Sequence, residues 1–159
     1  MRVGFGYDIH RFAEGRRLVL GGVEVEYPLG LLGVSDGDVV LHAIADAVLG
    51  AIGRGEIGIY FPPNSLSSQG IDSKVILKYV VEMADRDGFL ISNIDVTIVT
   101  EQPKLKKYYG LMRKAIAEIV GIGEDRINIK AKSNEGLDSV GRGEAIAAYS
   151  VVSVQEVKR

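Results

Sequence analysis

Cysteine is absent from the 159-residue chain, and histidine occurs only twice. The lack of cysteine excludes disulfide bonds, thiolate-held iron–sulfur clusters, thiolate zinc sites and cysteine nucleophiles. Any imidazole chemistry must come from His10 or His42, so both histidines are candidates for a functional site.

Long apolar runs and an excess of basic residues are also missing. No apolar stretch approaches the ~18 residues of a membrane-spanning helix, and the N-terminal segment lacks the uninterrupted apolar core of a signal peptide. Lys and Arg total 19 and Asp and Glu total 21, for a net charge of −2, which is unlike a general nucleic-acid binder. We expect a cytoplasmic protein with neither a nucleic-acid nor a membrane partner.

The length fits a single catalytic domain over residues 1–159. Apolar residues alternate with period two in some segments and recur at helical spacing in others. The predicted strands are 2–10, 18–20, 23–25, 91–100, 126–131 and 145–157, and the predicted helices are 39–52, 72–87 and 103–120. We expect Ser35 or Asp36 to cap the first helix and Pro103 to open the last.

This intermixed order predicts an α+β fold, a ferredoxin-like sheet with helices on one face. The last predicted strand is apolar on both of its faces. Because a helix-free sheet face needs cover, we expect an oligomer that buries it.

Two polar patterns predict a metal site. Asp8 and His10 lie two residues apart on the first predicted strand, so their side chains share a face about 6.6 Å apart at the backbone. In the first predicted helix, Asp38, His42 and Asp46 form a polar stripe, so Asp38 and Asp46 are candidates to orient the His42 ring. Two histidines and one carboxylate are typical of a catalytic zinc site, although surface and capping residues often show the same spacing.

Two further segments suit phosphate. Pro103 to Lys107 opens a predicted helix whose free N–H groups fit an anion, although a solvated lysine face has the same composition. Loop 132–142 combines Glu135, which suits a hard cation, with hydroxyls and Arg142, which suit phosphate; an ordinary hairpin loop also fits. Together with the metal pattern, these segments favour a metal-assisted reaction of a phosphate ester.

Separated motifs along nearly the whole chain resemble one known family. They are Gly4-Phe-Gly-Tyr-Asp-Ile-His10, Gly22, Ser35-Asp-Gly-Asp38 with Leu41-His-Ala43, Gly55-Glu-Ile-Gly58, Phe61-Pro62, Gly70-Ile-Asp-Ser73, Asp95-Val-Thr97, Gln102-Pro-Lys104 and 130–147. In this order they are similar to the 2-C-methyl-D-erythritol 2,4-cyclodiphosphate synthases of the non-mevalonate isoprenoid pathway.

The resemblance implies a homotrimer of ferredoxin-like subunits, with active sites between neighbouring subunits. It also implies a phosphorus–oxygen lyase of isoprenoid (terpenoid) biosynthesis. In the implied reaction, the 2-phosphate of 4-diphosphocytidyl-2-C-methyl-D-erythritol 2-phosphate attacks the β-phosphorus of its own diphosphate. The products are 2-C-methyl-D-erythritol 2,4-cyclodiphosphate and CMP.

The resemblance further implies roles for individual residues. Asp8, His10 and His42 match the ligands of one zinc ion per subunit, and Glu135 matches the ligand of a second divalent ion, magnesium or manganese. Ser133 matches a hydroxyl that stabilises the transition state. Substrate contacts are implied for Ser35, Glu56, Ile57, Gly58, Phe61, Thr100, Pro103, Lys104, Leu105, Lys106, Lys132, Asn134, Ser139 and Arg142. Arg142 would also bind an isoprenoid diphosphate at the threefold axis.

Some positions depart from the family pattern. Val34 stands at the catalytic position of the family's usual histidine, and Glu56 stands where aspartate is usual. Residues 63–65 read Pro-Asn-Ser in place of the common Asp-Thr-Asp, and Ser139 replaces a phenylalanine of some members. The predicted metal ligands are intact, so we expect the reaction to be retained with an altered rate.

Two other functions fit the same residues. One is a metal-dependent nucleotide phosphohydrolase, which would use water where the synthase uses the substrate's phosphate. The other is a non-catalytic α+β ligand-binding trimer.

Overall fold

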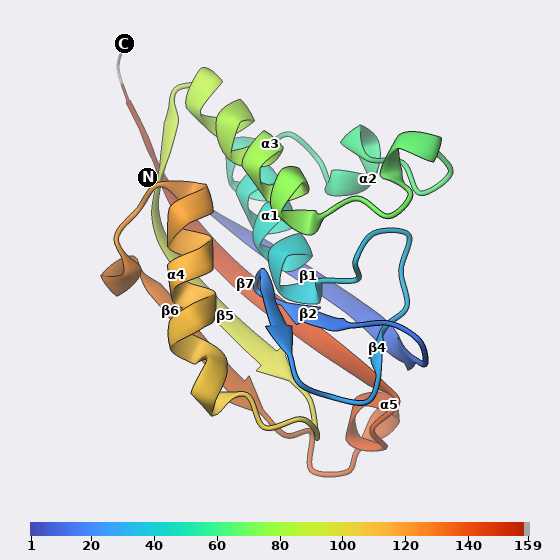
Figure 1. Ribbon diagram of the computed structural model, residues 1–159. Coiled ribbons are helices and arrows are strands. Elements are labelled where there is room, and N and C mark those ends of the chain that lie inside the picture. The colour runs from blue at the N-terminus through green and yellow to red at the C-terminus, as the bar shows by residue number, and fades with distance from the viewer. Residues whose placement is uncertain (158–159) are drawn as a thin grey trace.

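A five-stranded sheet forms the centre of the computed structural model, which describes residues 1–157. The strands run in the order β4–β1–β7–β5–β6 (Figure 1). They are β1 (Arg2–Ala13), β4 (Gly30–Leu31), β5 (Phe89–Val99), β6 (Ile127–Lys132) and β7 (Ala145–Glu156). A separate hairpin consists of β2 (Leu18–Leu20) and β3 (Val23–Val25).

The first and last long strands pair along most of their length. β1 and β7 are antiparallel, from Arg2 opposite Val154 to Arg11 opposite Ala145. β7 is also antiparallel to β5, and β5 is parallel to β6. Helix α4 (Tyr109–Val120) connects β5 to β6, because a parallel pair needs a crossover rather than a tight turn.

Three long helices, α1 (Val39–Ile52), α3 (Ser73–Arg86) and α4, cover one face of the sheet (Figure 1). Alternate residues of β5, namely Ile94, Val96 and Ile98, point into this layer and are fully buried. Helix α1 packs over β1 and β7, and twelve of its fourteen residues are buried. The main hydrophobic core therefore lies between the sheet and the three helices, and α1 is the most deeply buried of them.

The opposite sheet face carries exposed aromatic and aliphatic side chains. Tyr149 lies between Phe5 and Tyr7, with ring centroids 6.2 and 5.0 Å away. Val3 and Val151 extend this group, and all five side chains are at least 39% exposed. We call these five residues the exposed sheet face; nothing within residues 1–157 covers them.

Several elements have the predicted bounds. Helix 39–52 and the hairpin of 18–20 with 23–25 match the structure residue for residue. None of the helices in the described chain has the length and apolarity to cross a membrane. Short helices that the sequence pattern did not indicate are α2 (Ile57–Tyr60), α5 (Asp138–Gly141) and the single 3-10 turns η1 (Leu66–Ser68) and η3 (Glu124–Arg126).

The cap of α1 differs from the prediction. The side chain of Asp38, not that of Ser35 or Asp36, accepts the backbone N–H groups of Val40 and Leu41. The prediction was wrong because the loop before α1 continues to Asp38. Asp38 directly precedes the first helical residue, Val39, whereas Ser35 lies three residues earlier in the loop.

The predicted helix at Pro103 also begins elsewhere. Residues 101–105 form an irregular turn, in which the Thr100 hydroxyl donates to the Gln102 carbonyl at 2.6 Å. The 3-10 turn η2 (Lys106–Tyr108) then leads into α4 at Tyr109. The prediction was wrong because this local hydrogen bond and the burial of Leu105, which is 2% exposed, outweigh the helix preference of a first-turn proline.

Helix α1 approaches β1 closely at two glycines. A Cβ atom on Gly6 would overlap the carbonyl oxygen of Ala43, and one on Gly4 would overlap that of Ala47. Because only glycine lacks a Cβ, no other residue permits this spacing. The close packing brings α1 against the strand that carries two of the predicted metal ligands.

We predict that Gly6→Ala destabilises the fold by about 3 kcal/mol or more, because α1 must move away from the sheet to admit one methyl group. Urea denaturation measures the change in the free energy of unfolding. Gly110→Ala is the matched control, because a Cβ atom on Gly110 would have no neighbour within 4 Å. There we expect a gain of about 0.5–1 kcal/mol from helix propensity. Equal stability of the Gly6 variant and wild type would contradict the packing argument.

Candidate metal centre and substrate pocket

Asp8, His10 and His42 meet at one point between β1 and α1. The Oδ2 atom of Asp8 lies 3.1 Å from Nε2 of His10 and 2.9 Å from Nδ1 of His42. One ligand atom from each residue lies within 4.8 Å of the other two. The prediction that these three side chains converge is therefore confirmed.

The three donors fit a zinc ion. Zinc bonds of about 2.0–2.2 Å to nitrogen and oxygen place neighbouring ligand atoms of a tetrahedral site about 3.3 Å apart, close to the two measured distances. The side chains of Asp8 and His10 are 25% and 23% exposed, so a further ligand can approach from outside. Zinc is thus compatible with both the donor types and their spacing.

Asp8 supplies the negative charge of this centre. Burial raises the pKa of its carboxyl, but hydrogen bonds with His10 and His42 outweigh burial and hold the pKa below its ordinary value. The hydrogen bond with Asp8 in turn raises the pKa of His10. Asp8 is therefore ionised at neutral pH and attracts either protons on the imidazoles or a metal cation.

The second nitrogen of each imidazole is held by a protein oxygen. Nδ1–H of His10 donates to the carbonyl of Leu32 at 2.5 Å, so in the neutral ring the Nε2 lone pair faces Asp8. Nε2 of His42 lies 2.8 Å from the hydroxyl of Ser73 and 3.2 Å from that of Ser35. Each ring is thus oriented by hydrogen bonds at the nitrogen that faces away from Asp8, as is usual for metal-binding histidines.

Asp38 and Asp46, the predicted supports of His42, make their hydrogen bonds elsewhere. Asp38 is fully buried, and burial raises the pKa of its carboxyl to about 6. Its carboxylate accepts the backbone N–H groups of Gly21, Gly22, Val40 and Leu41. Asp46 accepts the N–H of Ile57 at 2.8 Å. Asp38 caps the start of α1, and Asp46 binds the start of α2. The hydroxyls of Ser73 and Ser35 therefore lie beside Nε2 of His42, where the sequence pattern predicted a carboxylate.

The three metal-site residues line a cavity of about 220 Å³. Its other lining residues are Val34, Ser35, Ile57, Gly58, Phe61, Pro63, Ser68, Ile71 and Ile76. The first five were predicted from the sequence. The other four come from segment 63–71 and from α3, and their residue types carry no signal for a binding site. Glu56, also predicted, directly precedes α2 and is exposed.

Ser133, Asn134 and Glu135 lie in a second group, organised by Glu101. The Ser133 hydroxyl lies 3.0 and 2.9 Å from the two carboxylate oxygens of Glu101, and the Asn134 N–H donates to Glu101 at 2.7 Å. The N–H of Glu135 donates to the Ser133 hydroxyl at 2.9 Å. The Asn134 N–H, followed by the Ser133 hydroxyl, holds the pKa of Glu101 below its ordinary value. The sequence pattern did not single out Glu101, because a lone glutamate after a strand is common.

This second group lies apart from the metal-site cavity, and so does the lysine segment, residues 103–107. None of their residues is among those that line it. Pro103, Lys104 and Lys106 line a different cavity of about 530 Å³, together with Glu26, Gln102, Lys107 and Tyr108. Thr100 is buried, and its N–H donates to the carbonyl of Lys132 at 3.0 Å. The side chain of Leu105 faces the core, so only its backbone is available to a ligand.

Ser139 and Arg142 belong to helix α5 and its C-terminus. Ser139 lines a cavity of about 570 Å³ with Ile9, Arg11, Phe12, Glu144 and Ala145. Nε of Arg142 lies 3.1 Å from a carboxylate oxygen of Glu144, so the guanidinium already has an anionic partner.

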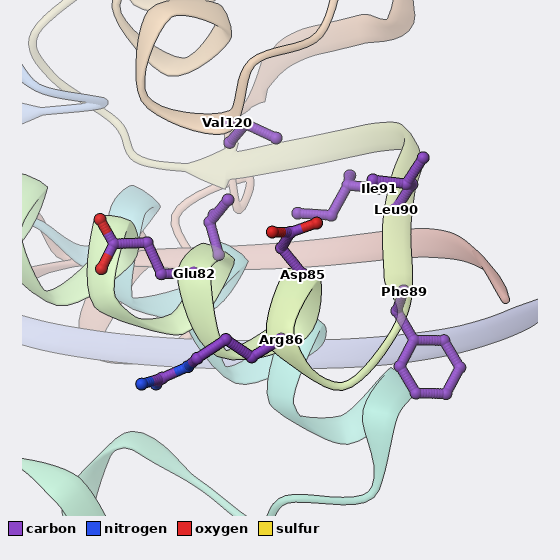
Figure 2. Close-up of a pocket in the computed structure, with 8 residues that line it drawn as sticks. Glu82, Asp85, Arg86, Phe89, Leu90, Ile91 and Val120 are labelled. Carbon is purple, nitrogen blue, oxygen red and sulfur yellow. The ribbon is translucent and has the colours of Figure 1, made fainter. Parts of the chain in front are cut away.

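Another cavity, of about 540 Å³, lies at the far end of α3 (Figure 2). The lining residues come from three elements: Val81, Glu82, Asp85 and Arg86 of α3, Phe89, Leu90 and Ile91 of β5, and Val120 of α4. It contains no histidine, and its α3 residues lie about 12–20 Å along the helix from Ser73. It is therefore separate from the metal centre.

The model of the YgbB family matches residues 1–155. The chain belongs to the YgbB family. Two curated relatives of this YgbB-family chain are named 2-C-methyl-D-erythritol 2,4-cyclodiphosphate synthase. The protein of Geobacter sulfurreducens is 49% identical over 156 residues, which cover 98% of this chain and 99% of the relative. That of Brachyspira hyodysenteriae is 46% identical over 158 residues, covering 99% and 100%. The resemblance predicted from the motifs is confirmed.

Solved structures of YgbB-like proteins share the fold. A CDP-bound 2C-methyl-D-erythritol-2,4-cyclodiphosphate synthase has a TM-score of 0.89 at 32% identity, covering 97% of this chain and 100% of that one. The bifunctional IspDF of Campylobacter jejuni has a TM-score of 0.95 at 37% identity. That alignment covers 99% of this chain but only 42% of the bifunctional protein. The mixed α+β architecture is thus that of the synthase family.

Proposed function

We propose that this chain catalyses the cyclisation of 4-diphosphocytidyl-2-C-methyl-D-erythritol 2-phosphate to 2-C-methyl-D-erythritol 2,4-cyclodiphosphate, with release of CMP. The synthase relatives match it over its full length. The observation that carries the proposal is the convergence of Asp8, His10 and His42 at the wall of one cavity. The enzyme is a phosphorus–oxygen lyase of isoprenoid precursor biosynthesis.

The substrate supplies its own nucleophile in this reaction. An oxygen of the 2-phosphate forms a bond to the β-phosphorus, while the bond from that phosphorus to the CMP oxygen breaks. Phosphoryl transfer depends on in-line positioning and on neutralised charge rather than on a protein nucleophile. A chain without cysteine is therefore equipped for this chemistry.

Asp8, His10 and His42 would hold the zinc ion, and Glu135 would hold magnesium or manganese. Bound cations supply Lewis-acid neutralisation of the phosphate oxygens. Around them, Ser35, Glu56, Ile57, Gly58 and Phe61 would contact the substrate. The Ser133 hydroxyl, which donates to Glu101 in the single chain, would donate instead to a phosphate oxygen on which transition-state charge develops.

We propose that the active enzyme is a homotrimer of ferredoxin-like subunits, each a single domain, acting in the cytoplasm. Two observations support the trimer. The exposed sheet face presents three aromatic rings and two valines. In addition, the Glu101–Ser133 group and the lysine segment do not reach the metal-site cavity of their own chain.

In the trimer, a neighbouring subunit brings these segments to the metal centre. Thr100, Pro103, Lys104, Leu105, Lys106, Lys132, Asn134, Ser139 and Arg142 then contact the nucleotide and phosphate parts of the substrate. Arg142 would also offer a bidentate contact to an isoprenoid diphosphate near the threefold axis, in exchange for Glu144.

The first prediction of this proposal concerns the reaction. Wild-type protein with zinc and magnesium converts the diphosphocytidyl substrate to one cyclic diphosphate and CMP. Phosphorus NMR measures this conversion. His42→Ala reduces turnover to background and zinc content from about one ion per chain to almost none, because one of three protein ligands is lost. Asp95→Asn is the control. It changes a remote carboxylate paired with Lys130, so turnover and zinc content both stay at the wild-type level.

The alternatives are separated by the same experiment. Linear phosphate products would identify a phosphohydrolase. Zinc-loaded protein that binds the substrate but does not convert it would identify a ligand-binding trimer.

The second prediction concerns assembly. Sedimentation of wild type gives a trimer at micromolar concentration, and Tyr149→Lys gives monomers, because a charge in an apolar interface is costly to desolvate. Leu111→Lys places the same charge on the exposed side of α4 and leaves the trimer intact. A monomeric wild type would refute the proposed assembly.

The third prediction concerns Val34. Its carbonyl accepts the N–H of Gly70 at 2.7 Å, so a change of side chain leaves the backbone in place. Val34→His raises turnover with little change in substrate affinity, because imidazole adds a donor for transition-state charge. We expect roughly a tenfold gain at most, less than the ~10²–10³ of a central donor, because two cations and Ser133 share the charge. Val34→Ala controls for pocket volume; an unchanged or slower histidine variant with intact metal content would exclude a catalytic role at this position.

A further inference from the structure

The hydroxyl of Ser73 is the nearer of the two side-chain groups behind His42. It lies 2.8 Å from Nε2, on the side of the ring opposite Asp8. Ser73 is fully buried at the first position of α3, where the preceding residue, Asp72, already caps the helix. The Ser73 side chain is therefore not needed as a cap.

Asp36 determines the direction of the hydrogen bond between Ser73 and His42. Its Oδ1 accepts a hydrogen bond from the Ser73 hydroxyl, and its Oδ2 accepts the Ser73 backbone N–H at 3.1 Å. A hydroxyl has one hydrogen, and an ionised carboxylate can only accept. With its hydrogen on Asp36, the Ser73 oxygen can only accept from His42, so Nε2 carries the hydrogen.

This direction fixes the tautomer that a metal needs. With hydrogen on Nε2, the neutral ring presents the Nδ1 lone pair toward Asp8, 2.9 Å away. A lone pair and a carboxylate repel at that distance unless a cation lies between them. The cation is a proton on Nδ1 or a metal ion bound by Nδ1, Asp8 and His10.

Asp36 is itself held firmly. Its Oδ1 also accepts the N–H of Asp38 at 3.1 Å, and its own N–H donates to the carbonyl of Ile71 at 3.2 Å. These bonds join the loop before α1 to the loop before α3. We call the hydrogen-bonded series Asp36–Ser73–His42 the relay. Backbone groups from these two loops hold Asp36 in place.

We propose that Ser73 and Asp36 are positioning residues that fix the tautomer and orientation of His42 and thereby raise the zinc affinity of the site. The inference rests on the metal site of the proposed function and identifies which residues support it. Ser73 and Asp36 thus take the supporting role that the sequence pattern assigned to Asp38 and Asp46, whose carboxylates accept backbone N–H groups instead.

The test is the zinc affinity of Ser73→Ala, measured by competition with a chromophoric chelator. We expect affinity to fall by about 10–100-fold, the usual effect of losing a hydrogen-bond partner behind a metal-binding histidine. Ser150→Ala is the matched control, because Ser150 is also a buried serine but its hydroxyl has no hydrogen-bond partner within the described residues. We expect its zinc affinity to stay within about twofold of wild type.

A second variant tests the direction of the relay. Asp36→Asn keeps the shape but removes the charge that holds the Ser73 hydrogen, so we expect a loss of about tenfold or less. The double variant should bind zinc no more weakly than Ser73→Ala, because Asp36 acts on His42 only through Ser73.

Nitrogen-15 NMR gives an independent readout. The chain has only two histidines, so the zinc-loaded protein shows two imidazole rings. In wild type, the His42 ring should be protonated at Nε2 with slow hydrogen exchange, and exchange should accelerate in Ser73→Ala.

The outcomes separate this inference from the proposed function. Zinc affinity of Ser73→Ala within twofold of wild type, or an equal loss in Ser150→Ala, would overturn the relay. If Ser73→Ala does not fold, unchanged affinity in Asp36→Asn overturns it. These measurements need no substrate, so a protein that passes them yet forms no cyclic diphosphate fails only the proposed function.

Discussion

The contact of α1 with β1 through Gly4 and Gly6 is the constraint on which the metal centre depends. With no Cβ on either glycine, the helix backbone lies against the strand backbone, and His42 lies beside Asp8. The ligands therefore come from a strand and a buried helix, not from loops. Such a site is held by the packing of the core, which keeps its geometry rigid.

Much of this arrangement could be predicted from local patterns. Strand periodicity alone placed Asp8 and His10 on one face, and the helical spacing of apolar residues gave α1 its bounds. The Ser73–Asp36 pair could not be predicted, because the two residues are 37 positions apart and both types are common near helix starts. The helix start at Pro103 failed for a related reason: the burial of Leu105 is a tertiary effect that the local sequence does not report.

The site residues of one chain form two separate groups. The metal centre and its cavity lie between β1, α1 and the segment before α3, whereas Glu101 organises Ser133, Asn134 and Glu135 in the loops that follow β5 and β6. The two loops come from parallel strands, so they leave the sheet at the same end. Under the proposed assembly, this division lets one subunit bind the nucleophilic part of a substrate while its neighbour binds the nucleotide part.

The buried carboxylate of Asp38 adds a polar link between the β2–β3 hairpin and α1, two elements that already share one hydrophobic core. It accepts N–H groups from the turn of the β2–β3 hairpin and from the first turn of α1. If either turn opened, a buried charge would lose half of its partners, which is costly. A two-stranded hairpin on its own is only marginally stable, but here its opening would expose Leu18, Leu20 and Val25 of the shared core and disrupt the cap of the helix that carries His42. The hairpin and the metal-binding helix therefore belong to one cooperative folding unit.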